Sequence, residues 1–215
     1  LANIYMHNVL TLWYKFVIRS NTVGNSFLAV YADDFIAGFQ YKEDAERYYA
    51  LLKERLKKFN LELEESKSRM IEFGKYAEIN SKRKYGRKAE TFNFLGFTLY
   101  CGKSRHSGEF CVKLKTNSKK FTQKLKQTKE WLYQNNDLPV KDLITRLNKK
   151  LVGHYRYYGV SHNINKLSAF LHYVQRYLFK VLNRRSHKKS YTWDGYIDML
   201  KVYPLAKPKI YVKLF

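Results

Sequence analysis

Two absences narrow the classes of protein that this sequence can represent. The two cysteines, Cys101 and Cys111, are too few for a disulfide framework and lack the spacing of a zinc site. They could face each other across a hairpin, although reduced thiols are the simpler interpretation. No stretch approaches the ~20 apolar residues that cross a membrane, and no signal-peptide pattern opens the chain. We therefore expect no zinc, no membrane partner and a cytoplasmic protein, in a bacterium or in the interior of an organelle.

Acidic side chains are also scarce, with 18 Asp and Glu against 41 Lys and Arg, which gives a net charge of +23. Residues 1–79 contain 11 basic and 11 acidic side chains, whereas residues 80–215 contain 30 and 7. A domain charged in this way repels itself unless a polyanion is bound, so nucleic acid is the expected partner. An anionic membrane surface is the alternative, which the spread of the cations over many segments disfavours.

The remaining composition is that of a folded protein, since 45% of the 215 residues are hydrophobic and 17% are aromatic. Helices are predicted over 1–19, 42–59 and 163–184, with helical structure throughout after Asn117 except for breaks near 135–139, 153–163 and 203–209. Strands are predicted over 26–31, 34–39, 68–73, 91–101 and 109–115, and a mobile basic loop over 75–90. We therefore expect an α+β fold with two parts, residues 1–116 and a basic helical domain over 117–215.

The segment Tyr31-Ala32-Asp33-Asp34-Phe35 places two adjacent carboxylates in one of the most apolar stretches of the chain. Buried carboxylates need a compensating partner because they lose their hydration. Mg²⁺ is one such partner, since it prefers oxygen ligands and is often held by one or two carboxylates together with substrate phosphates. A pair of such ions can activate a 3′-hydroxyl and stabilise a leaving pyrophosphate. The alternative is ordinary turn chemistry, with Asp-Asp at the tip of a hairpin.

Five segments, in this order, share the pattern of a known family. They are LANIYMHNVL, the Tyr31-Ala32-Asp33-Asp34 box, LKKFNLELEESKSRMIEFG, FNFLGFTLY, and a helical part that contains RLNKKLVGHYRYYGVSHNINKL and FKVLNRRSHKKSYTWDGY. Together they resemble the group II intron reverse transcriptase/maturase family, in which Tyr-x-Asp-Asp is the catalytic box and Phe-Leu-Gly-Phe forms the primer grip. The resemblance implies a partial right-hand polymerase palm of antiparallel strands and packed helices, followed by an all-helical thumb, or maturase (X), domain.

The resemblance assigns roles to residues of the first part. Asp33 and Asp34 would bind Mg²⁺ in a two-metal site, with Tyr31 beside the primer terminus. Lys67 would lie near the phosphates of the incoming dNTP, where a cation stabilises developing charge; a solvated surface lysine is an equal alternative.

The Phe-Leu-Gly-Phe segment would hold the primer end through Phe94, Leu95 and Gly96. Glycine fits because it permits close approach of the backbone. A role in the hydrophobic core is an equal alternative for Phe94, Leu95 and Phe97.

The chain also departs from the family pattern. The family has a further palm aspartate and nucleotide-binding fingers well before the Tyr-x-Asp-Asp box, but only thirty residues precede Tyr31. The first residues begin inside an element without Met or a capping signal, so we expect a piece of a larger fold that is inactive as a polymerase by itself. The Cys/His cluster of a zinc-bearing endonuclease domain is not found.

The basic helical part interleaves cations with aromatic residues, which is typical of RNA binding. Two groups are the candidate phosphate contacts: Arg146, Lys149, Lys150 and Arg156, and then Arg184, Arg185, Lys188 and Lys189. Core packing is expected for Tyr158, Phe170, Phe179 and Trp193, and no metal-ligand role for His106, His154 or His187.

Two functions remain open at this point. The first is a portion of an intron-encoded RNA-dependent DNA polymerase that binds an RNA template and a DNA primer. The second is a maturase-type module that binds intron RNA and assists splicing without polymerising. A degenerate remnant of such a protein, without activity, is a third and weaker alternative. The intact family motifs argue against it.

Overall fold

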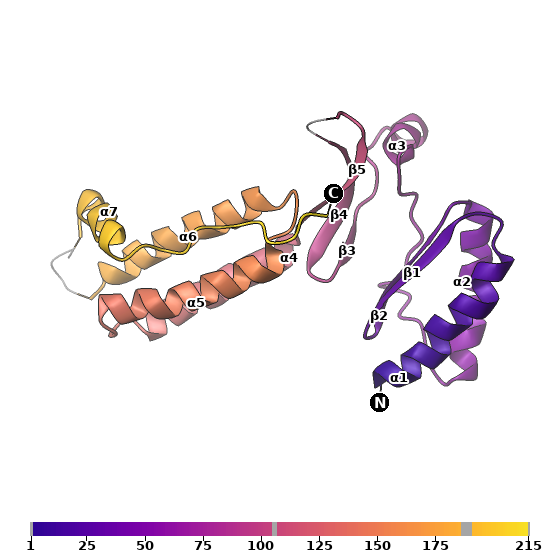
Figure 1. Cartoon of the computed structure of the whole chain (residues 1–215), viewed down its shortest axis with the longest axis horizontal. Coiled ribbons are helices and arrows are strands. Elements are labelled where there is room, and N and C mark those ends of the chain that lie inside the picture. The colour runs from indigo at the N-terminus through magenta and orange to yellow at the C-terminus, as the bar shows by residue number, and fades with distance from the viewer. Residues whose placement is uncertain (1, 105–106, 186–190, 215) are drawn as a thin grey trace. The chain divides into compact units, whose positions relative to one another are not determined.

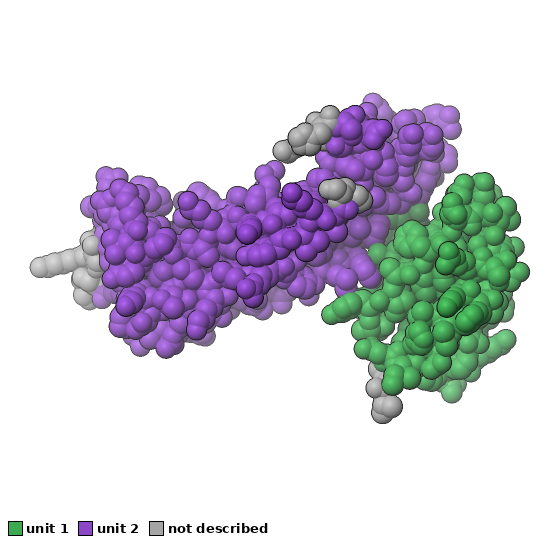
Figure 2. All heavy atoms as spheres, in the orientation of Figure 1, with its two compact units in different colours: residues 1–71 green, residues 72–215 purple. Residues whose placement is uncertain are grey.

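The computed structural model describes residues 2–104, 107–185 and 191–214. These residues form two compact units, 1–71 and 72–215 (Figure 2). The elements combine helices with two small antiparallel sheets, β1-β2 in the first unit and β3-β4-β5 in the second (Figure 1). The expected α+β class is therefore confirmed.

The first unit is a β-hairpin that shares one hydrophobic core with the N-terminal helical segment and α2. Its elements are α1 (Ala2–Met6), the π-helical segments η1 (His7–Leu12) and η2 (Tyr14–Ile18), the 3₁₀ turn η3 (Arg19–Asn21), β1 (Ser26–Tyr31), β2 (Asp34–Phe39) and α2 (Lys42–Lys58). Tyr48, Leu52 and Leu56, which recur every four residues in the sequence, form the buried face of α2. Side chains from the inner face of the hairpin, among them Leu28 and Phe35, pack against the same core.

The spacing of Leu1, Tyr5, Val9, Leu12 and Phe16 predicts that these side chains form the inward face of the first helix, and this prediction is only partly correct. Val9 is buried, but Phe16 is 66% exposed, and Leu10, Tyr14 and Ile18 line the core instead. The reason is that η1 and η2 are π-helical, so their backbone repeats at i→i+5 and shifts the inward face away from that of an α-helix.

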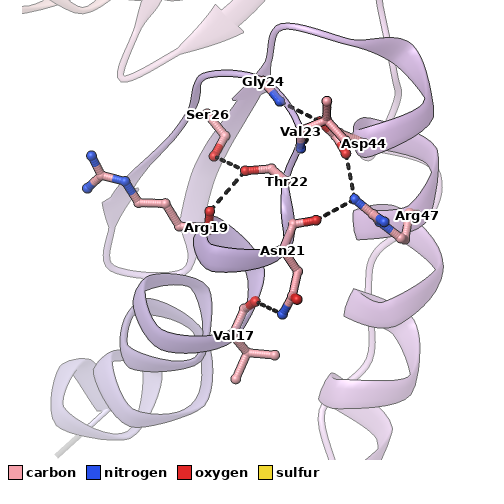
Figure 3. Close-up of polar contacts among 9 residues, drawn as sticks. All are labelled: Val17, Arg19, Asn21, Thr22, Val23, Gly24, Ser26, Asp44 and Arg47. Atoms are coloured by element: carbon pink, nitrogen blue, oxygen red, sulfur yellow. Dashed lines mark hydrogen bonds and ion pairs between the residues drawn. The ribbon is translucent and has the colours of Figure 1, made fainter.

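A buried carboxylate fixes the loop that leads into β1 (Figure 3). Asp44, in the first turn of α2, accepts hydrogen bonds from the backbone N–H groups of Val23 (3.0 Å) and Gly24 (3.2 Å). Its other oxygen pairs with Arg47 Nη2 at 2.6 Å, and the same nitrogen donates to the carbonyl of Asn21. The i,i+4 spacing of Glu43 and Arg47 would also allow an ion pair, but Arg47 pairs with Asp44, which the loop requires as an acceptor.

The second unit contains a three-stranded sheet and a helical bundle. Its elements are α3 (Ala77–Tyr85), β3 (Phe92–Phe94), β4 (Phe97–Lys103), β5 (Phe110–Thr116), α4 (Ser118–Gln134), α5 (Val140–Tyr158), α6 (Ile164–Leu182) and α7 (Trp193–Val202). Helix α6 lies alongside α4 and α5 (Figure 1). Leu143, Leu147, Leu167, Val174 and Leu178 are fully buried between these helices.

Two local predictions for residues 68–90 were wrong, and the break predicted over 153–163 begins later than expected. Residues 68–73 form no strand because no other described strand pairs with them, and an isolated strand is unstable. Residues 75–90 contain helix α3, which ends where Gly86 adopts a left-handed φ of 63° and donates to the carbonyl of Lys82. Helix α5 continues through Gly153 and ends at Tyr158.

The cysteines do not face each other. Cys101 pairs with Val112 across the β4–β5 ladder, whereas Cys111 pairs with Gly102. Neighbouring residues of a strand point to opposite faces, so the two side chains lie on opposite sides of the sheet. Both are free thiols.

A buried amide joins the sheet to the bundle. The Asn163 side chain is fully buried and accepts from the backbone N–H of Thr116 at 2.9 Å. Its amide nitrogen donates to Thr116 Oγ1 and to the carbonyl of Tyr158, each at 2.8 Å. Because its oxygen and nitrogen both have partners, Asn163 fixes the end of β5 against the end of α5.

Candidate functional site

The two aspartates lie at the tip of the β1–β2 hairpin. Ala32 and Asp33 form its two-residue loop, and Tyr31 pairs with Asp34, the first residue of β2. Ala32 has a φ of +53°, which this kind of tight loop demands of its first residue and which glycine adopts most readily. Both carboxylates and the Tyr31 ring are therefore presented beyond the packed part of the strands.

The expectation that these carboxylates are buried was wrong. Asp33 and Asp34 are both exposed, and Tyr31 is 64% exposed. The apolar residues on either side belong to the strands, where Leu28, Val30 and Phe35 pack on the core of the first unit. Water can hydrate the carboxylates at the hairpin tip, so they need no compensating ion in order to be stable.

The pair offers part of a Mg²⁺ ligand set. Mg²⁺ is commonly held by one or two carboxylates, with water and substrate phosphates completing the shell. Two exposed carboxylates on adjacent residues have this chemistry. Within the described residues, however, no group of three or more His, Cys, Asp or Glu side chains is placed to hold a metal ion. The described residues therefore offer no third His, Cys, Asp or Glu side chain that completes a metal site with this pair.

Lys67 lies in an exposed turn after α2. Its backbone N–H donates to the carbonyl of Glu64 at 3.1 Å. Hydrogen bonds from Ser66, and more weakly the charge of Lys67, lower the pKa of the Glu64 carboxyl. Across the described residues no ion pair joins Lys67 to Asp33 or Asp34. The nucleotide role of Lys67 therefore stays a prediction.

The Phe-Leu-Gly-Phe segment forms a tight turn between β3 and β4. Leu95 and Gly96 are its two central residues, and both have a positive φ, 48° and 77°. Tyr157 Oη donates to the carbonyl of Leu95 at 3.0 Å, and a Cβ on Gly96 would lie 3.0 Å from Tyr158 Oη. Glycine at this position thus serves both the turn and the close approach of α5. Phe97 is buried against the Tyr157 and Tyr158 rings.

The first group of predicted RNA contacts lies along one exposed face of α5. Arg146, Lys149, Lys150 and Arg156 are all exposed, and their spacing of three, four and ten residues places them on one side of the helix. None of the four forms an ion pair with a described acidic side chain. We call these four residues the α5 basic stripe.

The second group is only partly described. Arg184 is exposed, with its guanidinium 5.2 Å from the centre of the Tyr133 ring, and Arg185 is exposed beside it. Lys188 and Lys189, like His187 and His106, lie outside the described residues.

Two family models match the chain. Residues 1–99 match the model described as reverse transcriptase (RNA-dependent DNA polymerase), and residues 118–196 match the group II intron, maturase-specific domain. The chain belongs to the group II intron reverse transcriptase/maturase family. A search of curated proteins found no match.

The reverse transcriptase match contains the Asp33–Asp34 hairpin and the β3–β4 turn, and the maturase match contains the α5 basic stripe. The maturase match begins at Ser118, the first residue of α4. The compact units divide between residues 71 and 72 instead, because the β3–β5 sheet packs with the helices that follow it. The domain boundary near residue 117 stays a prediction. No described helix combines the length and apolar character of a membrane span.

The aromatic predictions for the maturase-specific domain have mixed outcomes. Phe170 is buried in the core, and Tyr158 and Phe179 pack against it. Trp193 is 50% exposed, so its assignment to the core was wrong. It is the first residue of α7, after the capping Thr192, and its half-exposed ring contacts Phe179 and Tyr196.

Sequence reasoning missed several residues that organise the two units. The buried Asp44, Asn163 and His154 carry no motif, since each is a lone polar residue within a helix or next to one. A weak signal existed for Asp44, because an acidic residue in the first turn of a helix can accept from nearby backbone N–H groups. No comparable signal distinguishes Asn163 or His154.

Proposed function

We propose that the first unit contributes the carboxylates of a polymerase site and that the helical domain binds structured RNA, as parts of one intron-encoded reverse transcriptase and maturase. Membership of the family supports the pairing of the two roles. The observation that carries the catalytic half is the exposure of Asp33 and Asp34 at a tight hairpin tip inside the reverse transcriptase match.

In this proposal Asp33 and Asp34 hold Mg²⁺ through their carboxylate oxygens. Two Mg²⁺ ions held in this site would supply activation of the primer 3′-hydroxyl and stabilisation of the leaving pyrophosphate in nucleotidyl transfer. Tyr31 flanks the carboxylates and offers its exposed ring to the primer terminus. Lys67 provides a cation for the dNTP phosphates.

The β3–β4 turn would place the primer strand. Leu95 and Gly96 present backbone at the tip of this turn, and Phe94 lies at its base. The contacts from Tyr157 and Tyr158 hold the tip in one position. A rigid turn suits this task, because a small error in the position of the primer end lowers the rate of the reaction.

The α5 basic stripe would supply the main phosphate contacts. Its cations are exposed and unpaired by described acids, so they are available to neutralise RNA. Arg184 and Arg185, which are exposed just after the end of α6, would add two further cations. Binding through many phosphates releases counterions and weakens steeply as salt rises.

RNA binding without polymerisation is the second candidate function of this chain. It is favoured by the finding that the described residues provide two adjacent carboxylates but no group of three metal ligands. Under this alternative the helical domain binds intron RNA, and Asp33 and Asp34 take no part in the activity of this chain.

Primer extension by the complete intron-encoded protein on an RNA template with Mg²⁺, together with RNA affinity, separates the two functions. For the polymerase role we expect extension that disappears in Asp33→Asn and Asp34→Asn while RNA affinity stays unchanged or rises slightly. Extension that persists in both variants would refute the carboxylate assignment. Absence of extension with RNA affinity intact would favour the second function, and a flat plot of log K against log salt would contradict the phosphate-binding account.

A further inference from the structure

A cavity of about 490 Å³ opens in the maturase-specific domain between α4, α5 and α6. Lys124 and Thr128 of α4 line one side, and Lys150 and Tyr157 of α5 line the other. Phe170 of α6 also contributes to its wall. The cavity has the size of sites that enclose a small organic ligand, and its lining is both cationic and aromatic.

His154 lines the cavity, and its buried imidazole makes no hydrogen bond to any described residue. The residue is 5% exposed, and neither ring nitrogen has a hydrogen-bond partner within the described chain. Its ring stacks on Phe170 with centroids 3.9 Å apart. A buried polar group without a partner is unfavourable, so a hydrogen-bonding group bound in the cavity would supply what the chain does not.

Gly153 is the second unexplained residue of the cavity. It lies inside α5, where glycine is less favourable than alanine, yet a Cβ at this position would meet no atom within 4 Å. Packing within the chain therefore gives no reason for glycine here. Its missing side chain leaves open space on the wall of the cavity and lets a ligand approach the α5 backbone.

The cavity also lies on the α5 basic stripe. Lys150 belongs to both, and Gly153 follows it by three residues on the same face of the helix. Lys124 adds a cation from α4, and no described acidic side chain pairs with Lys124 or Lys150. An anionic strand that follows the stripe would therefore pass the mouth of the cavity.

We propose that this cavity binds one unpaired nucleotide of a bound RNA, with its phosphate held by Lys124 and Lys150 and its base inserted beside Gly153 against Tyr157 and His154. The assignment rests on the proposed RNA binding of the helical domain. Cations for phosphate together with aromatic rings and a buried imidazole for a base match the way in which proteins recognise unpaired RNA. The cavity would give the domain a preference for loops and bulges over continuous duplex.

Filling the cavity tests this proposal without changing charge. Gly153→Leu adds a side chain into open space and replaces glycine by a better helix former, so the fold should be retained. The matched control is Ser168→Leu, which adds leucine at an exposed site on α6 outside the cavity. The probes are an RNA hairpin with an unpaired loop and a continuous duplex with the same stem sequence, and circular dichroism checks folding.

We expect Gly153→Leu to weaken hairpin binding by about tenfold relative to Ser168→Leu, since the added side chain would prevent one base from stacking in the cavity. Duplex affinity and the salt dependence should be equal in the two variants, because their charges are equal. Equal hairpin affinity in both variants would overturn the proposal. Failure of the unaltered chain to bind either RNA would instead refute the proposed RNA binding itself.

Two further measurements decide the source of the nucleotide and remain usable if Gly153→Leu does not fold. A nucleoside monophosphate that binds the unaltered chain as tightly as the hairpin does would assign the cavity to a free nucleotide and overturn the proposal. Photocrosslinking of a hairpin with 4-thiouridine in its loop should label the α5 peptide around Gly153 and Tyr157. Crosslinks confined to other elements would also overturn it.

Discussion

The Tyr157 hydroxyl donates a hydrogen bond to the carbonyl oxygen of Leu95, 3.0 Å away, and so connects the end of α5 to the β3–β4 turn. Leu95 adopts a φ of 48°, a backbone conformation that is unfavourable for a residue with a branched side chain. The contact therefore supports a turn that its own sequence does not favour. The maturase-specific domain in this way holds the turn expected to position the primer.

Removal of this hydroxyl should loosen the turn without disturbing the core. Tyr157→Phe keeps the ring that stacks on Phe97 and loses only the hydrogen bond, so we expect a loss of about 0.5–1.5 kcal/mol in the free energy of unfolding. Amide hydrogen exchange across β3 and β4 should become faster. Tyr173→Phe is the control, because the Tyr173 hydroxyl has no hydrogen-bond partner among the described residues. An equal change in both variants would show that the Leu95 contact contributes nothing.

The Asp44 carboxylate should be the most important polar side chain of the first unit. Asp44→Ala leaves the Val23 and Gly24 N–H groups without their acceptor and removes the partner of Arg47. Hydrogen bonds to a charged group contribute about 1.5–3 kcal/mol, so we expect a destabilisation of about 2–3 kcal/mol. Denaturant unfolding and hydrogen exchange at Val23 and Gly24 measure the effect. Glu43→Ala, an exposed neighbour in the same turn, should change stability by less than about 0.5 kcal/mol.

Periodic and turn-based signals predicted much of the architecture. Strands 26–31 and 34–39 agree with β1 and β2 because an apolar run on each side of a two-residue polar tip is what a hairpin requires. The buried face of α2 is equally predictable from the sequence, because Tyr48, Leu52 and Leu56 recur every four residues. These signals are local, and their structures form within one element or one pair of elements.

The errors arose where tertiary contacts or unusual backbone decide the outcome. Apolar neighbours suggested buried aspartates, but in a hairpin those neighbours face the core while the tip projects into solvent. Helix α3 was missed because its basic residues suggested a loop, although Gly86 is the kind of residue that commonly ends a helix. The cavity at His154 is lined by residues of three helices. Patterns in one sequence do not show which helices pack together, so the cavity could not be predicted.

The buried imidazole should make stability depend on pH. Burial, reinforced by the charge of Lys124, lowers the pKa of His154 to about 4, below its ordinary value of 6.5. Between these values the unfolded chain binds the proton and the folded chain does not, so stability falls as pH decreases from about 6.5 to about 4. Each pKa unit corresponds to about 1.4 kcal/mol, which gives a loss of roughly 3 kcal/mol from this residue.

Denaturant unfolding at a series of pH values measures this effect, and His154→Phe isolates it. Phenylalanine keeps a ring that can stack on Phe170 but cannot be protonated. The difference in stability between the two proteins should therefore shift by roughly 3 kcal/mol in favour of the variant between pH 7 and pH 4. A difference that does not vary with pH would mean that His154 titrates equally in the folded and unfolded chains.

The loop of the Asp33–Asp34 hairpin should be strained at Ala32. Alanine at a φ of +53° is less stable than glycine by about 1 kcal/mol, because its Cβ approaches the following carbonyl oxygen. Ala32→Gly removes this contact but gives the unfolded chain more freedom, which offsets part of the gain. We therefore expect stability to change by less than about 1 kcal/mol, whereas Ala32→Val, which branches at Cβ, should destabilise the hairpin clearly. Urea unfolding with hydrogen exchange at β1 and β2 measures both variants. If Ala32→Val were as stable as Ala32→Gly, the left-handed conformation at the tip would be refuted, and the carboxylates would have to be presented by a different turn.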